Sequence, residues 1–280
     1  MNDILLRQLE LKADLRDALA RAEFELVYQP VMNLWTGAMI GVEALLRWRH
    51  PTRGTVLPDE FVPLAEEIGE MTPLGDWALR EACRHIAHLH CRTVSALQVA
   101  INLAIGQLQS PDLISSISAV LAETGLKPAA LVLEIAETAI MQDPESTIDQ
   151  AHALKAMGLR LAIDDFGTGQ LSADHIRRFP ADILKIDKSV VDGIGTRGEG
   201  LALTTSLIDL AATLKLRSVA EGIERMEQLD RLRELGCDFG QGYLFSAAVE
   251  AHQLDWLASQ GGRWPRNHLS SGAPGDYRLA

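Results

Sequence analysis

Cysteine is scarce in this chain, and its spacing argues against two kinds of site. The 280 residues include three cysteines, Cys83, Cys91 and Cys237. An odd number without a close CxxC pair favours neither a disulfide framework nor a thiolate zinc site. We therefore expect all three to be reduced side chains that serve packing.

A long apolar run is missing from the N-terminal segment. Residues 1–24 mix charged side chains with leucines at helical spacing. This pattern predicts neither a signal peptide nor a membrane span, so we expect a cytoplasmic location without membrane insertion of this segment. If the chain is part of a longer protein, a membrane or sensor segment could still lie upstream.

An excess of positive charge is also missing. The sequence has 38 acidic and 26 basic residues, which gives a formal net charge of -12. Polymeric nucleic acid requires a basic face, so it is not an expected partner. A small anionic nucleotide remains possible, because bound divalent cations can make an acidic pocket receptive to phosphate.

Short apolar runs recur along the chain, separated by longer helical stretches. With 280 residues and 47% hydrophobic content, one α/β barrel is simpler than two small domains. The runs are ELVYQPV, MIGVEALL, LQVAIN, ALVLEI, LRLAID, DILKID, RSVAEG and CDFGQGY. Eight βα-type repeats predict a TIM-like (β/α)8 barrel. The first two runs are joined only by NLWTGA, which predicts an irregular, antiparallel first strand.

The two ends of the chain differ from this repeating pattern. Residues 3–22 are predicted to form an amphipathic helix with an apolar stripe. The stripe consists of Ile4, Leu5, Leu9, Leu11, Leu15 and Leu19. We therefore divide the chain into a linker or capping helix at 1–22, a barrel at 23–260 and a disordered tail at 261–280, which is rich in Gly, Pro and Ser.

Ionisable or amide side chains occur where the apolar runs end. They are Glu43, Asn102, Glu134, Asp164, Asp165, Lys185 and Glu221. The C-terminal ends of parallel barrel strands meet at one mouth, so these side chains are predicted to form one cluster. Oxygen ligands without cysteine or histidine suit hard ions, and we expect two divalent metal ions, Mg²⁺ or Mn²⁺.

Each of these residues has a simpler interpretation when taken alone. An acidic residue at a strand end is more often a helix cap or a solvated loop residue than a ligand. Lys185 could be a surface lysine beside Asp187. However, burial of a lysine within DILKID would be costly without charged partners, and six strand-end oxygen donors together favour a functional site.

The ordered motifs of the chain resemble those of the EAL domain family. The resemblance runs from about Phe24 to Leu257, and its motifs in order are YQP, EALLRWRHP, PDEFVPLAEE, IN, DDFGTG, KID, AEGIE and QGYLF. It implies a cyclic-di-GMP-specific phosphodiesterase that produces linear pGpG and so lowers the level of a bacterial second messenger. It also implies a homodimer and allows an upstream sensor or GGDEF domain.

The resemblance also implies roles for individual residues. Glu43, Asn102, Glu134, Asp164, Asp165 and Glu221 would hold the two metal ions, with Lys185, Glu43 and Glu221 catalytic. Lys185 would orient or activate the attacking water. Gln29, Leu46, Arg47 and Gln241 would contact the nucleotide, and Glu137 would brace the loop after Asp165. The Arg47 guanidinium is also suited to phosphate on chemical grounds.

Two segments depart from the pattern of the family. The loop usually similar to DDFGTGYSSL is DDFGTGQLSA here, with Gln170, Leu171 and Ala173 at the changed positions. QGYLFSRP has become QGYLFSAA, so Ala247 and Ala248 remove a charge and a ring. An active hydrolase is the first interpretation. The alternatives are a cyclic-di-GMP receptor that is catalytically weak or inactive, and an interaction scaffold.

Overall fold

The computed structural model describes residues 2–93, 96–167, 173–194 and 199–263. Gln170, Leu171 and most of the predicted C-terminal tail lie outside this range. Within it, no helix is both long enough and apolar enough to cross a membrane. The three cysteines are all free.

Eight strands form a closed barrel, as predicted. In chain order they are β1 (Phe24–Asn33), β2 (Met39–His50), β4 (Gln98–Asn102), β5 (Leu131–Ala136), β6 (Arg160–Phe166), β7 (Ile183–Ile186), β8 (Arg217–Ala220) and β9 (Phe239–Gly240). The strands from β2 to β9 pair in parallel in that order. Each corresponds to one of the apolar runs of the sequence.

Strand β1 closes the barrel in the opposite direction. It pairs antiparallel with β2 along most of its length and antiparallel with β9 at Met32 and Asn33. The short turn between β1 and β2 leaves no room for a crossover helix, so the predicted irregularity is confirmed. Two short strands extend the sheet, β3 (Gly54–Val56) beside β2 and β10 (Val249–Glu250) beside β1.

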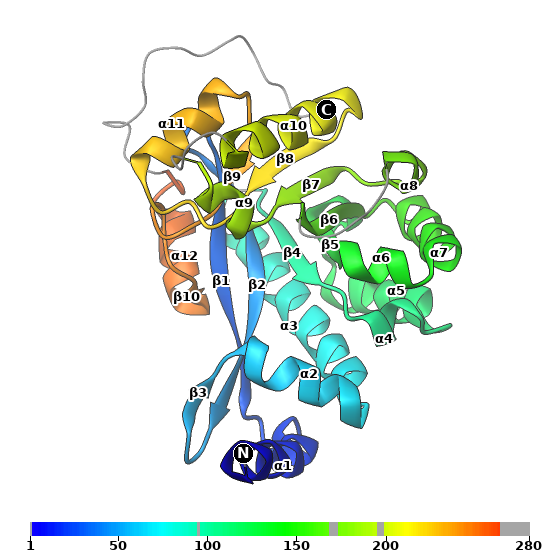
Figure 1. Ribbon diagram of the computed structural model, residues 1–280. Coiled ribbons are helices and arrows are strands. Elements are labelled where there is room, and N and C mark those ends of the chain that lie inside the picture. The colour runs from blue at the N-terminus through cyan, green and yellow to red at the C-terminus, as the bar shows by residue number, and fades with distance from the viewer. Residues whose placement is uncertain (1, 94–95, 168–172, 195–198, 264–280) are drawn as a thin grey trace.

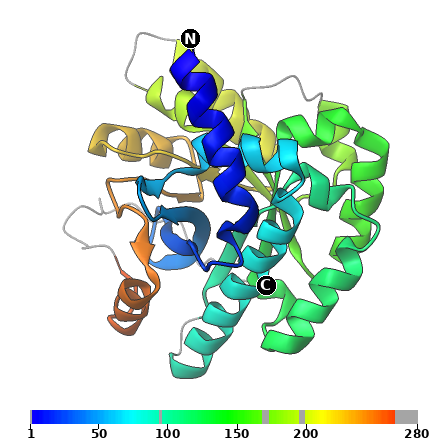
Figure 2. The same ribbon diagram turned by 90° about the horizontal axis from the view of Figure 1, so that it is seen from below.

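Helices surround the strands (Figures 1 and 2). They are α2 (Pro58–Ile68), α3 (Met71–Arg92), α4 (Ile105–Leu108), α5 (Leu113–Thr124), the 3-10 helix η1 (Pro128–Ala130), α6 (Glu137–Gln142), α7 (Pro144–Ala156), α8 (Ala173–Arg178), α9 (Lys188–Asp192), α10 (Glu199–Thr213), α11 (Met226–Glu234) and α12 (Ala251–Ser259). Their apolar faces cover the outer side chains of the strands and form the main core.

The N-terminal helix α1 (Asn2–Ala18) packs on α2. It ends four residues before the predicted boundary, and Leu11 and Leu15 of the predicted stripe are buried against a second core that contains Trp48 and Phe61. Leu9 is 55% exposed, so it faces away from that core. Ion pairs join α1 to the rest of the chain, for example Arg53 to Glu10 at 2.6 Å.

The barrel interior is layered along the strands. Small and medium apolar side chains from several strands form an inner cluster, namely Ala100, Val132, Ala162, Ile183 and Val219, with Val31 and Phe239 packed against it. Since inward-facing residues recur every second position, the next inward positions toward the C-terminal mouth are Asn102, Glu134, Asp164, Lys185, Glu221 and Gln241. A charged layer therefore lies directly above an apolar one.

Candidate active site

Lys185 lies at the centre of the charged layer. Its side chain is 3% exposed, and its Nζ lies 2.7 Å from Glu221 Oε1 and 2.8 Å from Glu134 Oε1. Asp164 Oδ1 is 3.0 Å away and Glu43 Oε2 is 3.4 Å away. Three carboxylates from β2, β5 and β6 and one that directly follows β8 thus converge on one ammonium group, which explains how a lysine is accommodated inside the barrel.

Two amide side chains hold the carboxylate of Glu43. Gln241 Nε2 donates to Glu43 Oε2 at 2.6 Å and to Glu221 Oε1 at 3.3 Å. Asn102 Nδ2 donates to Glu43 Oε1 at 3.0 Å. Glu43 is therefore fixed from both sides, and the amides link it to the neighbouring strands.

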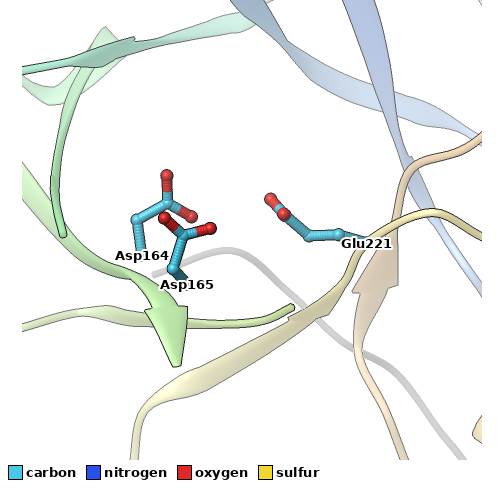
Figure 3. Close-up of side chains that lie close together, drawn as sticks. All are labelled: Asp164, Asp165 and Glu221. Atoms are coloured by element: carbon cyan, nitrogen blue, oxygen red, sulfur yellow. The ribbon is translucent and has the colours of Figure 1, made fainter. Parts of the chain in front are cut away.

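Asp164 and Asp165 point toward the same space although they are consecutive. Asp165 has a φ of 54°, in the left-handed region, and the pairing of β6 with β7 shifts between Ile163 and Phe166. This bend turns both carboxylates toward Glu221, and ligand oxygens of the three residues lie within 4.8 Å of one another (Figure 3). The left-handed angle thus lies at an aspartate rather than only at the glycines of DDFGTG.

The loop after Asp165 is held from the neighbouring strand. Gly167, with a φ of 105°, donates its backbone N–H to Glu137 Oε2 at 3.3 Å. Glu137 is 2% exposed and begins α6. A buried glutamate at the start of α6 thus anchors the backbone two residues after Asp165. The rest of the altered loop, including Gln170 and Leu171, lies outside the described residues, and Ala173 is the first residue of α8.

Burial and repulsion strongly perturb the carboxylates. Burial, followed by the charge of Glu43, raises the pKa of Glu134 well above its ordinary value. Burial raises the pKa of Glu221 to about 8, against the opposing charge of Lys185. Burial also acts on Glu43, but Lys185 and the hydrogen bonds from Gln241 and Asn102 outweigh it, so that pKa is lowered. The cluster therefore holds more negative charge than one lysine can balance.

The residues of this cluster fit a divalent metal. Five carboxylates and one amide supply hard oxygen donors, and Glu134 Oε2 is buried without a hydrogen-bond partner among the described residues. Asp164, Asp165 and Glu221 can each offer one oxygen to a common ion. Such a donor set suits Mg²⁺ or Mn²⁺ chemistry, and a cation would stabilise the ionised carboxylates, which burial and mutual repulsion disfavour.

A cavity of about 400 Å³ opens beside the carboxylates. Asn102 and Asp165 form its inner wall, and Leu46 of β2 lines it as well. The remaining wall comes from α2 and the start of α3 and includes Asp59, Val62, Glu66 and Met71. This cavity is wide enough for part of a nucleotide, and its polar end lies at the candidate metal ligands.

The other predicted contact residues lie on β1 and β2. Gln29 is paired with Glu43 in the antiparallel register, and its Nε2 donates to the Ser246 carbonyl oxygen at 3.4 Å. Arg47 is half-buried, and its Nη1 donates to the Leu46 carbonyl oxygen at 2.7 Å. Burial lowers the pKa of Arg47, while the nearby Tyr243 and acidic groups oppose that effect.

Sequence reasoning assigned no role to several residues of this region. Asp59, Glu66 and Met71 line the cavity. In the sequence, Asp59 and Glu66 belong to the motif PDEFVPLAEE, and Met71 lies four residues after its end. Tyr243 is 72% exposed and close enough to affect Arg47 electrostatically. Its position two residues after Gln241 in QGYLF was the available signal.

Comparison with known proteins gives consistent matches. The EAL domain family model matches residues 12–248. The cyclic di-GMP phosphodiesterase NbdA of Pseudomonas aeruginosa is 40% identical over 89% of this chain and 32% of its own length. The bifunctional diguanylate cyclase/cyclic di-GMP phosphodiesterase MucR of the same organism is 39% identical over 91% of this chain and 37% of its own. The chain thus spans about a third of the length of these relatives.

A solved structure supports the same assignment. The PaMucR phosphodiesterase in complex with c-di-GMP is 38% identical, covers 88% of this chain and 99% of that chain, and superposes with a TM-score of 0.85. The family model extends over most of the barrel. This chain belongs to the EAL domain family.

Proposed function

We propose that this chain hydrolyses cyclic-di-GMP to linear pGpG in a metal-dependent reaction. The observation that carries the proposal is the convergence of Glu43, Glu134, Asp164 and Glu221 on Lys185, with Asp165 beside them. The names of the relatives NbdA and MucR describe phosphodiesterases of this dinucleotide. Both activities belong to longer proteins, so the assignment to this chain is our inference.

The proposed metal site comprises Glu43, Asn102, Glu134, Asp164, Asp165 and Glu221, with two Mg²⁺ or Mn²⁺ ions. When bound, such ions supply positive charge that binds phosphate oxygens and facilitates attack by water at neutral pH. The chain itself holds the ligands in place. Gln241 and Asn102 orient Glu43, and the bend at Asp165 presents two adjacent carboxylates on one side.

Lys185 is proposed as the catalytic group that orients the attacking water. The charges of Glu134 and Glu221 outweigh its desolvation and raise its pKa well above the ordinary value, so it remains protonated. A protonated lysine can donate hydrogen bonds that orient water and stabilise negative charge on phosphate oxygens. It does not act as a base in this state. Glu43 and Glu221 stay next to its Nζ and are assigned catalytic roles with it.

The nucleotide is proposed to lie in the 400 Å³ cavity and extend toward Arg47. Leu46 would contact a base, and the Arg47 guanidinium would bind phosphate oxygens. Gln29 and Gln241 flank Glu43 and complete the contacts. With Ala247 and Ala248 in the place of a charge and a ring, we expect fewer contacts to the base than the family pattern provides.

Product analysis tests the proposal directly. Purified protein is incubated with cyclic-di-GMP in Mg²⁺, in Mn²⁺ and in excess chelator, and nucleotides are separated by chromatography. We expect pGpG in the two metal-containing samples and unchanged substrate with chelator. Intact substrate in all three samples, together with saturable binding, would support the receptor alternative. If cyclic-di-GMP neither binds nor is hydrolysed, the interaction scaffold is the remaining interpretation.

Assembly and location complete the proposal. We infer a homodimer on the basis of family resemblance, and cyclic-di-GMP as the small-molecule partner. Leu171, an apolar candidate for a contact between the two subunits, lies outside the described residues. Three free cysteines are compatible with a reducing cytoplasm. Relatives about three times as long allow an upstream sensor or GGDEF domain in the complete protein. Analytical ultracentrifugation with and without nucleotide tests the dimer.

A further inference from the structure

A second cavity opens at the opposite mouth of the barrel. Its volume is about 310 Å³, and it is lined by the N-terminal parts of strands β2 and β4 to β9. TIM-barrel interiors are usually filled by branched side chains. Here Ala100 lines the cavity with only a methyl group, which leaves space beneath the charged layer; Gly41 lines it too, although a Cβ there would lie 2.8 Å from the Gln98 carbonyl oxygen.

The walls of this cavity are mainly apolar. Side chains from five strands form them, namely Val31, Val132, Ile183, Val219 and Phe239. Val31 and Phe239 remain partly exposed although they belong to the inner cluster, so the cavity is open to a ligand. Glu134 and Lys185 form its inner end. An apolar body entering from this mouth would stop below the two charged residues.

The rim of the cavity has a cationic side. Arg217 donates to Asp238 Oδ1 at 2.8 Å, and Asp182 accepts from Lys155 Nζ at 2.7 Å, so these charges are paired. Arg160 forms no ion pair with any residue that the structure describes. Its Nε and Nη1 lie 3.2 and 3.0 Å from the side-chain amide of Gln98, whose oxygen accepts from both when the amide is turned. A guanidinium with only a neutral partner can bind an added carboxylate.

We propose that this cavity binds a small amphipathic carboxylate, with its anionic group at Arg160 and its apolar body inside the barrel. Arg160 and Asp164 are four residues apart on β6, which corresponds to a depth of roughly 13 Å at the usual strand rise. A single ring or a short alkyl chain fills that depth. The site is separate from the cavity proposed for the nucleotide, and the inference does not depend on hydrolysis of cyclic-di-GMP.

Calorimetric titration with a matched pair of probes tests this site. The probes are 3-phenylpropanoate and its neutral amide, 3-phenylpropanamide, which differ mainly in charge. We expect saturable binding of the carboxylate and at least about tenfold weaker binding of the amide, because the Arg160 contact is charge-assisted. Because this comparison uses the unmodified chain, it does not depend on the folding of a variant. Absence of carboxylate binding, or equal affinity for both probes, would overturn the proposal.

Variants then locate the binding site. Arg160→Gln is expected to weaken carboxylate binding about tenfold, and Ala100→Leu to abolish it by filling the cavity. Arg231→Gln, which changes an exposed arginine on α11, is the control and should bind like the unmodified protein. Excess cyclic-di-GMP should not displace the probe. Displacement, or full binding by both cavity variants, would place the probe elsewhere and refute the assignment.

Discussion

Lys185 balances buried negative charge as well as serving the proposed chemistry. Its ammonium group lies between carboxylates of β2, β5 and β6 and the one that follows β8. Removal of one partner from a buried ionic cluster leaves uncompensated charge, which is more costly than the loss of an exposed pair. The same residue therefore links stability to metal binding.

Lys185→Met tests that link. In chelator, we expect the variant to lose about 3 kcal/mol of unfolding free energy or more, because the carboxylates lose their cation. In excess Mg²⁺ the loss should be smaller, and turnover should still be absent. Urea unfolding under both conditions measures the difference. Lys188→Met is the control, since Lys188 is half exposed and should have little effect. Equal losses in chelator and Mg²⁺ would contradict this explanation.

Glu43→Gln tests the anchored ligand. The amide keeps the size of the side chain but removes the charge that Lys185 and the two neighbouring amides stabilise. We expect turnover to fall by at least about 100-fold, as is typical when metal ligation is disturbed. Initial rates of pGpG formation provide the measurement. Glu234→Gln, which changes an exposed glutamate at the end of α11, is the control and should retain most of the activity; unchanged rates in both variants would refute the role of Glu43.

The cysteines give a prediction about thiol chemistry. Burial raises the pKa of Cys83 and of Cys237 to about 12, whereas Cys91 is exposed. Because the thiolate is the reactive form, the two buried thiols remain protonated and unreactive at pH 8. A chromogenic disulfide reagent should titrate one thiol in the folded protein and three in denaturant. Rapid reaction of more than one thiol in the folded state would contradict the structure.

The turn after β9 positions Gln241 and depends on one glycine. Gly242 has a φ of 153°, and a Cβ at this position would lie 2.2 Å from the backbone nitrogen and oxygen of Ile223. Gly236 also has a positive φ, 84°, but no atom lies within 4 Å of the corresponding Cβ position. An alanine at position 242 would therefore cause a steric collision, whereas an alanine at position 236 would cause backbone strain alone.

Alanine substitutions at these two glycines give different expected costs. Gly236→Ala should cost about 1–2 kcal/mol of unfolding free energy, which reflects the left-handed backbone alone. Gly242→Ala should cost clearly more and should also reduce turnover, since Gln241 would lose its position beside Glu43. Urea unfolding and rate measurements test both variants. Similar stability for the two would show that the turn can relax.

The sequence predicted the repeating elements more fully than the short or bent ones. All eight apolar runs became barrel strands, because parallel strands that are buried on both faces appear in a sequence as short continuous apolar runs. Strands β3 and β10 were missed, since two or three residues carry too little pattern. The positive φ at Asp165 was missed as well. Aspartate tolerates that conformation without requiring it, so its choice depends on tertiary contacts.

The candidate site was predicted in composition but not in arrangement. The rule that strand ends meet at one mouth brought Glu134 and Glu221 together. The predicted strand-end position of Glu43 was wrong, because β2 continues to His50, but its side chain still joins the cluster. The position of Lys185 between four carboxylates could not be predicted, because it depends on the stagger of the strands around the closed barrel. The lower cavity also went unnoticed, since small residues such as Gly41 and Ala100 give no functional signal in a sequence.

At the scale of the whole molecule, metal binding is expected to stabilise the barrel. The ligands come from β2, β4, β5 and β6 and from the end of β8, so an ion would join distant parts of the chain. An ion at 100 times its dissociation constant adds about 2.7 kcal/mol. For a chain of this size, that raises Tm by roughly 5–10 °C.

Thermal unfolding in Mg²⁺ and in chelator measures this effect. The double variant Asp164→Asn with Asp165→Asn is the matched comparison, because it removes two proposed ligands at one strand end. We expect its Tm to be nearly the same in both solutions. A metal-dependent rise as large as that of the unmodified protein would show that the ion binds elsewhere.

The antiparallel closure by β1 has a consequence for synthesis on the ribosome. Asn33 of β1 pairs with Phe239 of β9, so the barrel cannot close there until Phe239 has been synthesised. The 206 residues from Leu34 to Phe239 take roughly 10 to 40 s to translate at about 5–20 residues per second. Until then the β1–β2 hairpin has an unpaired edge in the nascent chain. Strand β1 is therefore paired on this edge only after β9 has been synthesised. We expect the nascent chain to depend on chaperones during this interval.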